Sequence, residues 1–140
     1  MELGLKGKVA LVTGSSRGIG RGIALAFADE GCDLLLTGRD AQALQEVATS
    51  IRGKGRKAAV CVLDLREPSA AGTLVAAVQR EFDGLDILVN NAGATKRGDF
   101  FALTDADWED GYALKFFAHV RLARGLAAVE GGQNPRAVLP

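Results

Sequence analysis

The chain has 140 residues, the size of one domain, and 48% of them are hydrophobic, which is ordinary for a globular protein. Seventeen basic residues balance 17 acidic ones, so no net field favours nucleic acid or an anionic membrane. No apolar stretch approaches the ~20 residues of a membrane span, and two cysteines, Cys32 and Cys61, form neither a metal set nor a disulfide framework. We therefore expect a cytoplasmic protein without a metal site.

Apolar runs and helical spacing alternate along the chain. Short apolar runs predict four strands: Val9–Thr13, Asp33–Thr37, Ala58–Leu63 and Asp86–Asn90. Apolar residues at helical spacing predict four helices: Gly18 to Glu30, Asp40 to about Arg52, Glu67 or Pro68 through Phe82, and Thr104 to about Val129. Because the strands are continuous apolar runs, they suit a parallel sheet covered on both faces. The sequence therefore predicts a doubly wound α/β fold of about four strands with helices on both faces.

The last predicted helix carries a start signal and an aromatic stripe. Residues 104–107, TDAD, have the form of a capping box in which Asp replaces Glu. Trp108, Tyr112, Phe116 and Val120 follow at four-residue spacing. We expect this stripe to face the core.

Residues 131–140 differ in composition from the rest of the chain. They are rich in Gly, Asn and Pro, which favour turns. Their one apolar piece, Ala137–Leu139, is too short to predict a strand. We therefore predict a folded domain over residues 1–130 and an irregular tail over residues 131–140.

A glycine-rich stretch, TGSSRGIG at residues 13–20, lies between the first strand and the first helix. Gly14, Gly18 and Gly20 can serve, in that order, a tight turn, a close backbone approach to a pyrophosphate and close helix–strand packing. The helix directs its first N–H groups and its positive dipole end at the same place. The pattern therefore predicts a dinucleotide-binding turn.

The spacing T-G-x-x-x-G-I-G resembles the signature of the short-chain dehydrogenase/reductase family. Two further stretches agree with that family: NNAG at residues 90–93, ending the fourth strand, and Asp64, just after the third. The resemblance covers residues 7 to about 124 and implies a Rossmann-like fold, present as the N-terminal, cofactor-binding half. It also implies hydride transfer between a nicotinamide dinucleotide and a carbonyl or alcohol substrate.

The resemblance assigns cofactor contacts by position in these motifs. The residues concerned are Gly14, Ser15, Ser16, Arg17, Gly18, Ile19, Gly20, Arg39, Asp64, Leu65, Asn91, Ala92 and Gly93. In the family, the Asp after the third strand contacts the adenine. Taken singly, Asp64 could instead cap the turn before a helix, and Asn90 and Asn91 could be turn residues.

The end of the second strand bears on the choice between NADP and NAD. An acidic side chain there would bond both ribose hydroxyls of NAD and repel the 2′-phosphate of NADP, whereas an arginine would pair with that phosphate. Here Thr37 is followed by Gly38 and Arg39, and Arg17 lies in the glycine-rich turn. These residues favour NADP over NAD, although Arg39 could instead be a solvated loop arginine beside Asp40.

Tyr112 and Lys115 raise the question of catalysis. The family uses a Tyr-x-x-x-Lys pair with a Ser about a dozen residues earlier, and here the spacing is one residue too short. By resemblance this segment precedes that active site, and Lys115 stands where the family has an Asn that supports a water. We expect that Lys at position 115 either simply lacks the water-binding amide of that Asn or carries a proton itself. We expect His119 to be structural. No serine follows Ser69 and no tyrosine follows Tyr112, so we assign no catalytic residue in this chain.

Three interpretations remain open. In the first, the chain is a truncated or frameshifted NADP-dependent short-chain reductase and is inactive as 140 residues. In the second, it is a non-enzymatic NADP(H)-binding module whose partner contacts the exposed edge of the fourth strand and the helix over residues 104–129; the same helix could support an oligomer or an aggregate. In the third, it is a non-functional fragment. The sequence names no substrate.

Overall fold

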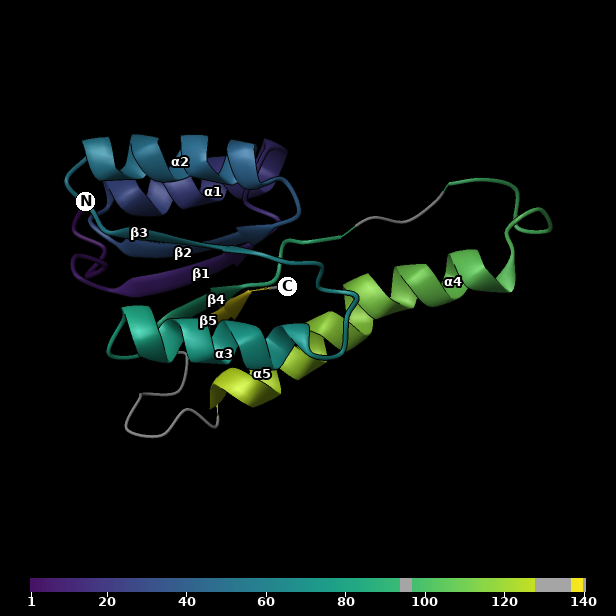
Figure 1. The fold of residues 1–140 in the computed structure, drawn as a ribbon. Coiled ribbons are helices and arrows are strands. Elements are labelled where there is room, and N and C mark those ends of the chain that lie inside the picture. Colours follow the sequence, from purple (N-terminus) through teal and green to yellow (C-terminus); the bar gives the residue numbers. More distant parts are fainter. Residues whose placement is uncertain (94–96, 128–136, 140) are drawn as a thin grey trace.

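The computed structural model describes residues 1–93, 97–127 and 137–139, and in them a parallel sheet lies between two layers of helices. The strands run in the order β3-β2-β1-β4-β5 (Figure 1). Their bounds are β1 (Val9–Thr13), β2 (Asp33–Gly38), β3 (Ala58–Val62), β4 (Ile87–Val89) and β5 (Ala137–Leu139). The predicted doubly wound α/β fold is therefore confirmed.

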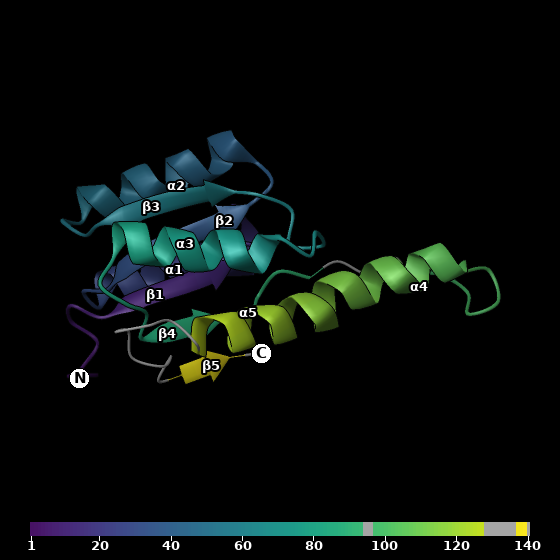
Figure 2. The same cartoon turned by 60° about the horizontal axis from the view of Figure 1, so that its bottom comes forward.

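Helices cover both faces of the sheet. One face carries α1 (Gly18–Asp29) and α2 (Ala41–Gly53), and the other carries α3 (Ala70–Glu81) and α5 (Ala118–Ala127), as Figure 2 shows. In the described part of the chain, no helix combines the length and the apolar character needed to cross a membrane.

Successive strand residues alternate between two cores. Ala10 and Val12 of β1 pack under α1 and α2, whereas Leu11 between them packs under α3 and α5. Both faces of each central strand are thus buried, which explains why these strands are continuous apolar runs.

The sheet is larger than the sequence predicts. Residues 137–139, which we expected in an irregular tail, form β5 and pair in parallel with β4, with Leu88 opposite Val138. Our expectation of an exposed edge on the fourth strand is therefore wrong, because β4 lies between β1 and β5. The other tail residues, 131–136 and 140, lie outside the described residues.

The last predicted helix consists of three segments. α4 (Asp105–Tyr112) leads into a π-helix, η1 (Ala113–Phe117), and then into α5. The capping box is present, since the Thr104 hydroxyl accepts from the Asp107 N–H and the Asp107 carboxylate accepts from the Thr104 N–H. α4 projects away from the sheet (Figure 1).

The aromatic stripe of this helical segment does not face the core. Trp108, Tyr112, Phe116 and Val120 are all exposed, with 55% of Tyr112 accessible to solvent. The core side is instead made by residues of α5: Ala118, Leu122 and Leu126. The expected orientation was therefore wrong, and the segment presents its largest apolar side chains to solvent.

Candidate cofactor site

The carboxyl ends of β1, β2 and β4 meet at one edge of the sheet. Thr13 ends β1 beside Thr37 of β2, and Val12 lies beside Val89 of β4. In doubly wound sheets this edge is where nucleotides bind, close to the strand order's point of reversal. The glycine-rich turn, residues 14–17, leaves β1 at this edge and enters α1.

Glycine is required at three places in and after this turn. Gly14 has a φ of +64° and Gly18 a φ of +58°, both in the left-handed region that side chains disfavour. A Cβ at Gly20 would lie 2.1 Å from the Gly14 carbonyl oxygen and 2.5 Å from Asn91 Nδ2. Gly20 therefore allows α1 to start directly against β1, as the motif predicts. Nothing lies within 4 Å of a Cβ built at Gly18, so the backbone there is open to a ligand.

Thr13 joins the turn to the segment after β4. Its hydroxyl is buried and accepts hydrogen bonds from the N–H groups of Asn91 and Ala92, both at 2.9 Å, and donates to the Val89 carbonyl at 3.3 Å. The Asn91 side chain returns two bonds, from Nδ2 to the carbonyls of Thr13 (3.1 Å) and Gly14 (3.2 Å). Asn91 thus fixes the turn through its backbone and its side chain, and Ala92 through its backbone. Thr13 is a partner to which we had assigned no role.

Ser15 joins the turn to β2. Its side chain is fully buried; its hydroxyl accepts from the Thr37 N–H and its own N–H donates to the Thr37 carbonyl, both at 3.2 Å. The Ser16 side chain lies 3.6 Å from the Cβ position of Gly38, at the end of β2. Ser15 therefore holds the turn, while Ser16 and Gly38 border the place where a ribose would lie.

The start of α1 suits a phosphate. Its N-cap residue, Arg17, makes no side-chain capping bond to the first N–H groups, and Ile19 in its first turn is 77% exposed. Helix N–H groups without such a cap, next to open backbone, are ready donors to an anion. The residues present thus fit a pyrophosphate.

Two arginines flank this position. Arg17 is exposed and its Nη2 lies 3.8 Å from Asp40 Oδ2. Arg39 follows β2 and is also exposed. Both side chains are exposed at this edge, so neither guanidinium is held in the core.

Asp64 follows β3 and is bound by Arg66. The Arg66 side chain donates to both carboxylate oxygens at 2.8–3.1 Å, and these bonds hold the pKa of Asp64 below its ordinary value. Its neighbour Leu65 is buried in the core under α3 and α5, so it positions the loop from below. Arg66 was missed from the sequence, because no motif of the family draws attention to it.

The segment after β4 also touches η1. A Cβ at Gly93 would lie 3.0 Å from Lys115 Cε, so the lysine stem runs across the glycine while the residue stays exposed. His119 Nε2 lies 3.3 Å from the Ala92 carbonyl oxygen, which gives this histidine a backbone partner. The structure thus brings Lys115 beside the candidate site, whereas Tyr112 is exposed on α4.

Other features do not compete with this site. A hollow of about 720 Å³ lies at the opposite edge of the sheet, where Lys8, Asp33 and Asp86 line the amino ends of the strands. Parallel α/β sheets bind ligands outside the carboxyl ends, so we do not assign the nucleotide there. Within residues 1–93, 97–127 and 137–139, no group of three His, Cys, Asp or Glu side chains could hold a metal ion.

A family model described as short chain dehydrogenase matches residues 8–134. The chain belongs to the short-chain dehydrogenase family. It is 39% identical over 106 residues to gluconate 5-dehydrogenase of Gluconobacter oxydans, covering 76% of this chain and 41% of that protein. It is 32% identical over 111 residues to 2,3-dihydro-2,3-dihydroxybenzoate dehydrogenase of Bacillus subtilis, covering 79% and 42%. The chain thus spans less than half the length of these relatives.

Solved structures of the family have the same fold. L-sorbose reductase from Gluconobacter frateurii, complexed with NADPH and L-sorbose, superposes with a TM-score of 0.88 and 41% identity over 91% of this chain and 49% of its own. A short chain dehydrogenase from Burkholderia cenocepacia, in complex with NADP, gives a TM-score of 0.84 at 39% identity, over 88% and 51%. The Rossmann-like fold and the predicted family are therefore confirmed.

Proposed function

We propose that this chain binds NADP(H) at the carboxyl edge of β1 and β2, as the cofactor half of a short-chain reductase. The observation that carries the proposal is the start of α1, which is uncapped, open at Gly18 and fixed to β1 by the close approach at Gly20. The pyrophosphate would bind residues 14–20, and Asn91, Ala92 and Gly93 would border the nicotinamide. When bound, the cofactor supplies a hydride to a carbonyl carbon or accepts one from an alcohol.

The preference for NADP rests on charge. Gly38 offers no carboxylate to the ribose hydroxyls, while Arg39 and Arg17 can pair with a 2′-phosphate. The two solved relatives that are complexed with NADPH and NADP support this choice. Asp40 lies near Arg17, but both side chains are largely solvated, so this contact leaves Arg17 available.

A calorimetric titration of the 140-residue chain with NADPH and NADH tests the preference. We expect NADPH to bind at least about tenfold more tightly at low salt, as one charge-assisted contact of about 1.5 kcal/mol provides. Arg39→Ala should remove most of this difference and leave the affinity for NADH unchanged. Arg52→Ala, on the far end of α2, is the matched control. Equal affinities for both cofactors in the unaltered chain would refute the preference.

We further propose that these 140 residues bind the cofactor without turnover. They contain no Tyr-x-x-x-Lys and no serine after Ser69. Lys115 lies against Gly93, where it can place a charge near the nicotinamide, but a proton transfer would need a partner that this chain does not supply. NADPH oxidation with a panel of ketones and sugars should stay at the level of the buffer blank. Turnover by the purified chain would refute this proposal.

A non-enzymatic cofactor-binding module is the second candidate function, and the exposed aromatic side chains of α4 and η1 favour it. A cooperative thermal melt with saturable stabilisation by NADPH would support either candidate over a non-functional fragment. Activity restored by adding the C-terminal half of a relative would favour the reductase over the module.

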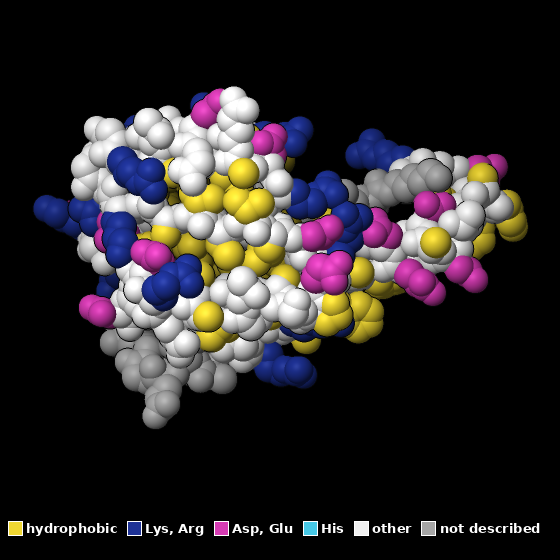
Figure 3. Space-filling model, viewed as in Figure 1, with side chains coloured by type: hydrophobic (Ala, Val, Ile, Leu, Met, Phe, Trp, Pro, Cys, Tyr) yellow, Lys and Arg dark blue, Asp and Glu magenta, His cyan; other side chains and the backbone are white. Residues whose placement is uncertain are grey.

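We propose that the exposed helix over residues 104–129 also pairs with a second copy of the chain; residues 128 and 129 lie outside the described residues. Figure 3 shows apolar and acidic side chains together on the projecting α4. Acidic Asp105 and Glu109 lie at one end of the segment and basic Arg121 and Arg124 at the other, so an antiparallel pair would match opposite charges.

Sedimentation velocity tests this pairing. Phe116→Glu should shift a dimer toward the monomer, whereas Gln42→Glu, which adds the same charge to the exposed face of α2, should not. A monomer at all concentrations in the unaltered chain would refute the pairing.

We also propose a cytoplasmic location. Both cysteines are free in the structure, and burial raises the pKa of the Cys32 thiol to about 11, which suits an unreactive thiol in a reducing compartment. Cell fractionation tests this, and recovery in a secreted fraction would refute it.

A further inference from the structure

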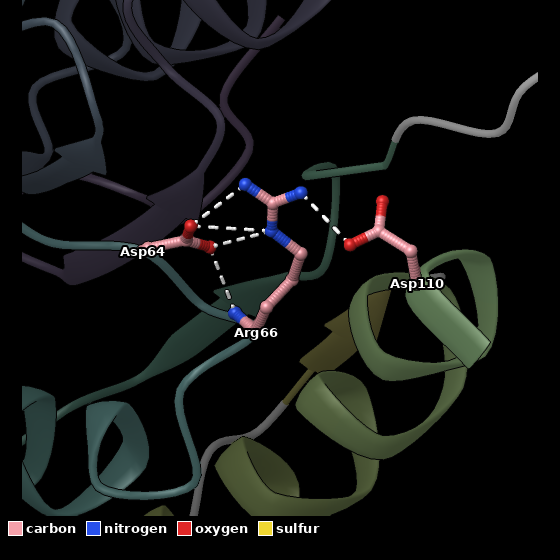
Figure 4. A network of polar contacts seen from close by, with 3 residues as sticks. All are labelled: Asp64, Arg66 and Asp110. Carbon is pink, nitrogen blue, oxygen red and sulfur yellow. Dashed lines mark hydrogen bonds and ion pairs between the residues drawn. The ribbon is translucent and has the colours of Figure 1, made fainter. Parts of the chain in front are cut away.

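Arg66 lies between two acidic residues from distant parts of the chain. Its Nη2 donates to Asp64 Oδ2 at 2.8 Å, and its Nε lies 3.0 and 3.1 Å from the two carboxylate oxygens. Its backbone N–H also donates to Asp64 Oδ1, at 3.0 Å. On the other side of the guanidinium, Nη1 donates to Asp110 Oδ1 at 2.9 Å (Figure 4). One side chain therefore spans the loop after β3 and helix α4.

The two-pronged contact of the Arg66 guanidinium, the fork, fixes the direction of the Asp64 carboxylate. A guanidinium is planar and binds both oxygens at once, which a lysine ammonium cannot do. A carboxylate has about four acceptor positions, and the three N–H groups of Arg66 that face Asp64 use most of them. The remaining capacity suits a single further donor, such as an exocyclic amino group of a base.

Asp64 lies on the side of the site where an adenosine would be. The Leu63 N–H donates to the Gly38 carbonyl at 3.0 Å, so the loop holding Asp64 runs beside the end of β2. In the strand order β3-β2-β1-β4-β5, β4 with Gly93 is two strands further from β3 than β2 is. A contact at Asp64 therefore concerns the adenosine half of a dinucleotide and not its nicotinamide half.

Asp110 ties the same arginine to α4. This helix projects from the sheet, and its aromatic side chains are exposed, so few apolar contacts hold its orientation. Asp110 is itself about half exposed, which makes its bond to Arg66 a modest one. A movement of α4 would nonetheless move the acceptor that orients the outer side of the guanidinium.

We propose that Arg66 is a positioning residue: it holds the Asp64 carboxylate toward the adenosine half of the cofactor and makes cofactor affinity depend on α4 through Asp110. This inference rests on the proposed NADP(H) site. It assigns to α4 an influence on cofactor binding, although no residue of α4 need touch the cofactor.

The test separates the two halves of the cofactor. Binding of 2′,5′-ADP, which carries the adenosine half, and of reduced nicotinamide mononucleotide, which carries the other half, is measured by calorimetry or ligand-observed NMR. The variants are Arg66→Ala, Arg66→Lys, Asp110→Asn and Asp64→Asn. The matched control is Glu109→Gln, which removes one negative charge from the neighbouring position of α4. Unfolding curves show whether each variant keeps the fold.

The expected losses concern 2′,5′-ADP alone. Arg66→Ala should weaken its binding about tenfold, by loss of charge-assisted bonds. Arg66→Lys keeps the charge but loses the fork, and should weaken it about fivefold. Asp110→Asn should cost about threefold, as expected for a largely exposed ion pair, and Glu109→Gln less than about 1.5-fold. Binding of the nicotinamide mononucleotide should change by less than about twofold throughout.

A double-mutant cycle tests the route through Asp64. In an Asp64→Asn background, Arg66→Ala should weaken 2′,5′-ADP binding by less than about twofold more, because the carboxylate it positions is gone. Full additivity of the two changes would overturn the proposal. So would Arg66→Lys behaving like the unaltered chain, or equal losses for both half-cofactors.

The outcome also distinguishes this inference from the function on which it rests. If the unaltered chain binds NADPH and Asp110→Asn matches Glu109→Gln, the link to α4 is refuted and the cofactor site stands. If the unaltered chain binds neither NADPH nor 2′,5′-ADP, the proposed function is refuted and the inference is refuted with it.

Discussion

The carboxyl edge of the sheet and the projecting α4 differ in how their side chains are used. At the edge, Thr13 and Ser15 are fully buried, and each exchanges hydrogen bonds with a neighbouring segment of the chain. On α4 and η1, by contrast, Trp108, Tyr112 and Phe116 are each more than 40% exposed. The hydroxyls of Thr13 and Ser15 thus have partners within the chain, whereas the buried Thr37 Oγ1 and Asn90 Oδ1 at the same edge have none among the described residues. The helical segment leaves large apolar side chains exposed.

This difference shows which region is stabilised by contacts within the chain and which exposes apolar surface that another surface could cover. Buried polar groups that are hydrogen-bonded, as at Thr13 and Ser15, favour one defined geometry, because another arrangement would leave a donor unpaired in a dry environment. Exposed aromatic side chains gain stability only when another surface covers them. We therefore expect substitutions at the edge to act on folding and cofactor binding, and substitutions on α4 to act on association.

The strongest test of the tight packing at the carboxyl edge of the sheet is Gly20→Val. A Cβ there would lie 2.1 Å from the Gly14 carbonyl oxygen, so α1 would have to move away from β1. We expect a loss of about 3 kcal/mol in the free energy of unfolding and no measurable NADPH binding. Urea unfolding and the cofactor titration check both.

The control for Gly20 is two residues further along α1. Nothing lies within 4 Å of a Cβ at Gly22, so Gly22→Ala should raise stability by up to about 1 kcal/mol and leave NADPH binding unchanged. If both variants had the same unfolding free energy and the same NADPH affinity, the tight contact at Gly20 would not contribute to stability or binding.

A second test compares the two sides of the last helical segment. Leu122 is fully buried against α3, whereas Val120 is 44% exposed. Leu122→Ala should lower the free energy of unfolding by about 3 kcal/mol, because it leaves a cavity, and Val120→Ala by less than about 1 kcal/mol. Denaturant melts measure both changes. A larger loss of unfolding free energy for Val120→Ala than for Leu122→Ala would show that the aromatic stripe faces the core.

The orientation of this helix shows where prediction from the sequence stops. Two apolar stripes run along it at four-residue spacing, one through Phe116 and one through Leu122. Periodicity finds both but cannot choose between them, and the larger aromatic residues suggested the wrong one. The choice is made by packing against α3, and η1 alters the register of the turn between α4 and α5.

The glycine-rich turn at the carboxyl edge was predictable because the residues that define it are close together in the sequence. Val9–Thr13 is a strand with the predicted bounds, and the glycines needed by the turn stand within seven residues of one another. The contacts of Arg66 were not predictable in the same way, since Asp110 is 44 positions away in the chain. β5 was missed for a related reason: three residues carry little strand signal of their own, and pairing with β4 defines them.

A third test removes the hydroxyl that closes the edge. Thr13→Val removes the buried hydroxyl that accepts from the N–H groups of Asn91 and Ala92. The Asn91 N–H keeps a second acceptor, the Val89 carbonyl at 3.1 Å, so the loss falls mainly on Ala92. We expect a loss of about 2 kcal/mol in the free energy of unfolding and weaker NADPH binding. Thr49→Val is the matched control on the exposed face of α2 and should change stability by less than about 0.5 kcal/mol. Equal losses of unfolding free energy for Thr13→Val and Thr49→Val would mean that the Thr13 hydroxyl does not stabilise this edge.

The smallest effect is expected where the two regions meet, at Asp64 and Arg66. Bonds from Arg66 lower the pKa of Asp64 in the folded chain below the ordinary value of 3.8. The resulting stabilisation is therefore present above that value and is lost as the pH falls through the lower, folded pKa. Arg66→Gln should reduce the free energy of unfolding by no more than about 1 kcal/mol at pH 7, because both side chains are partly solvated, and by less as Asp64 becomes protonated. Urea unfolding along a pH series measures this difference, with Arg80→Gln as the control for loss of a surface arginine. A difference that stayed constant below the folded pKa would show that Arg66 stabilises the junction by packing and not by charge.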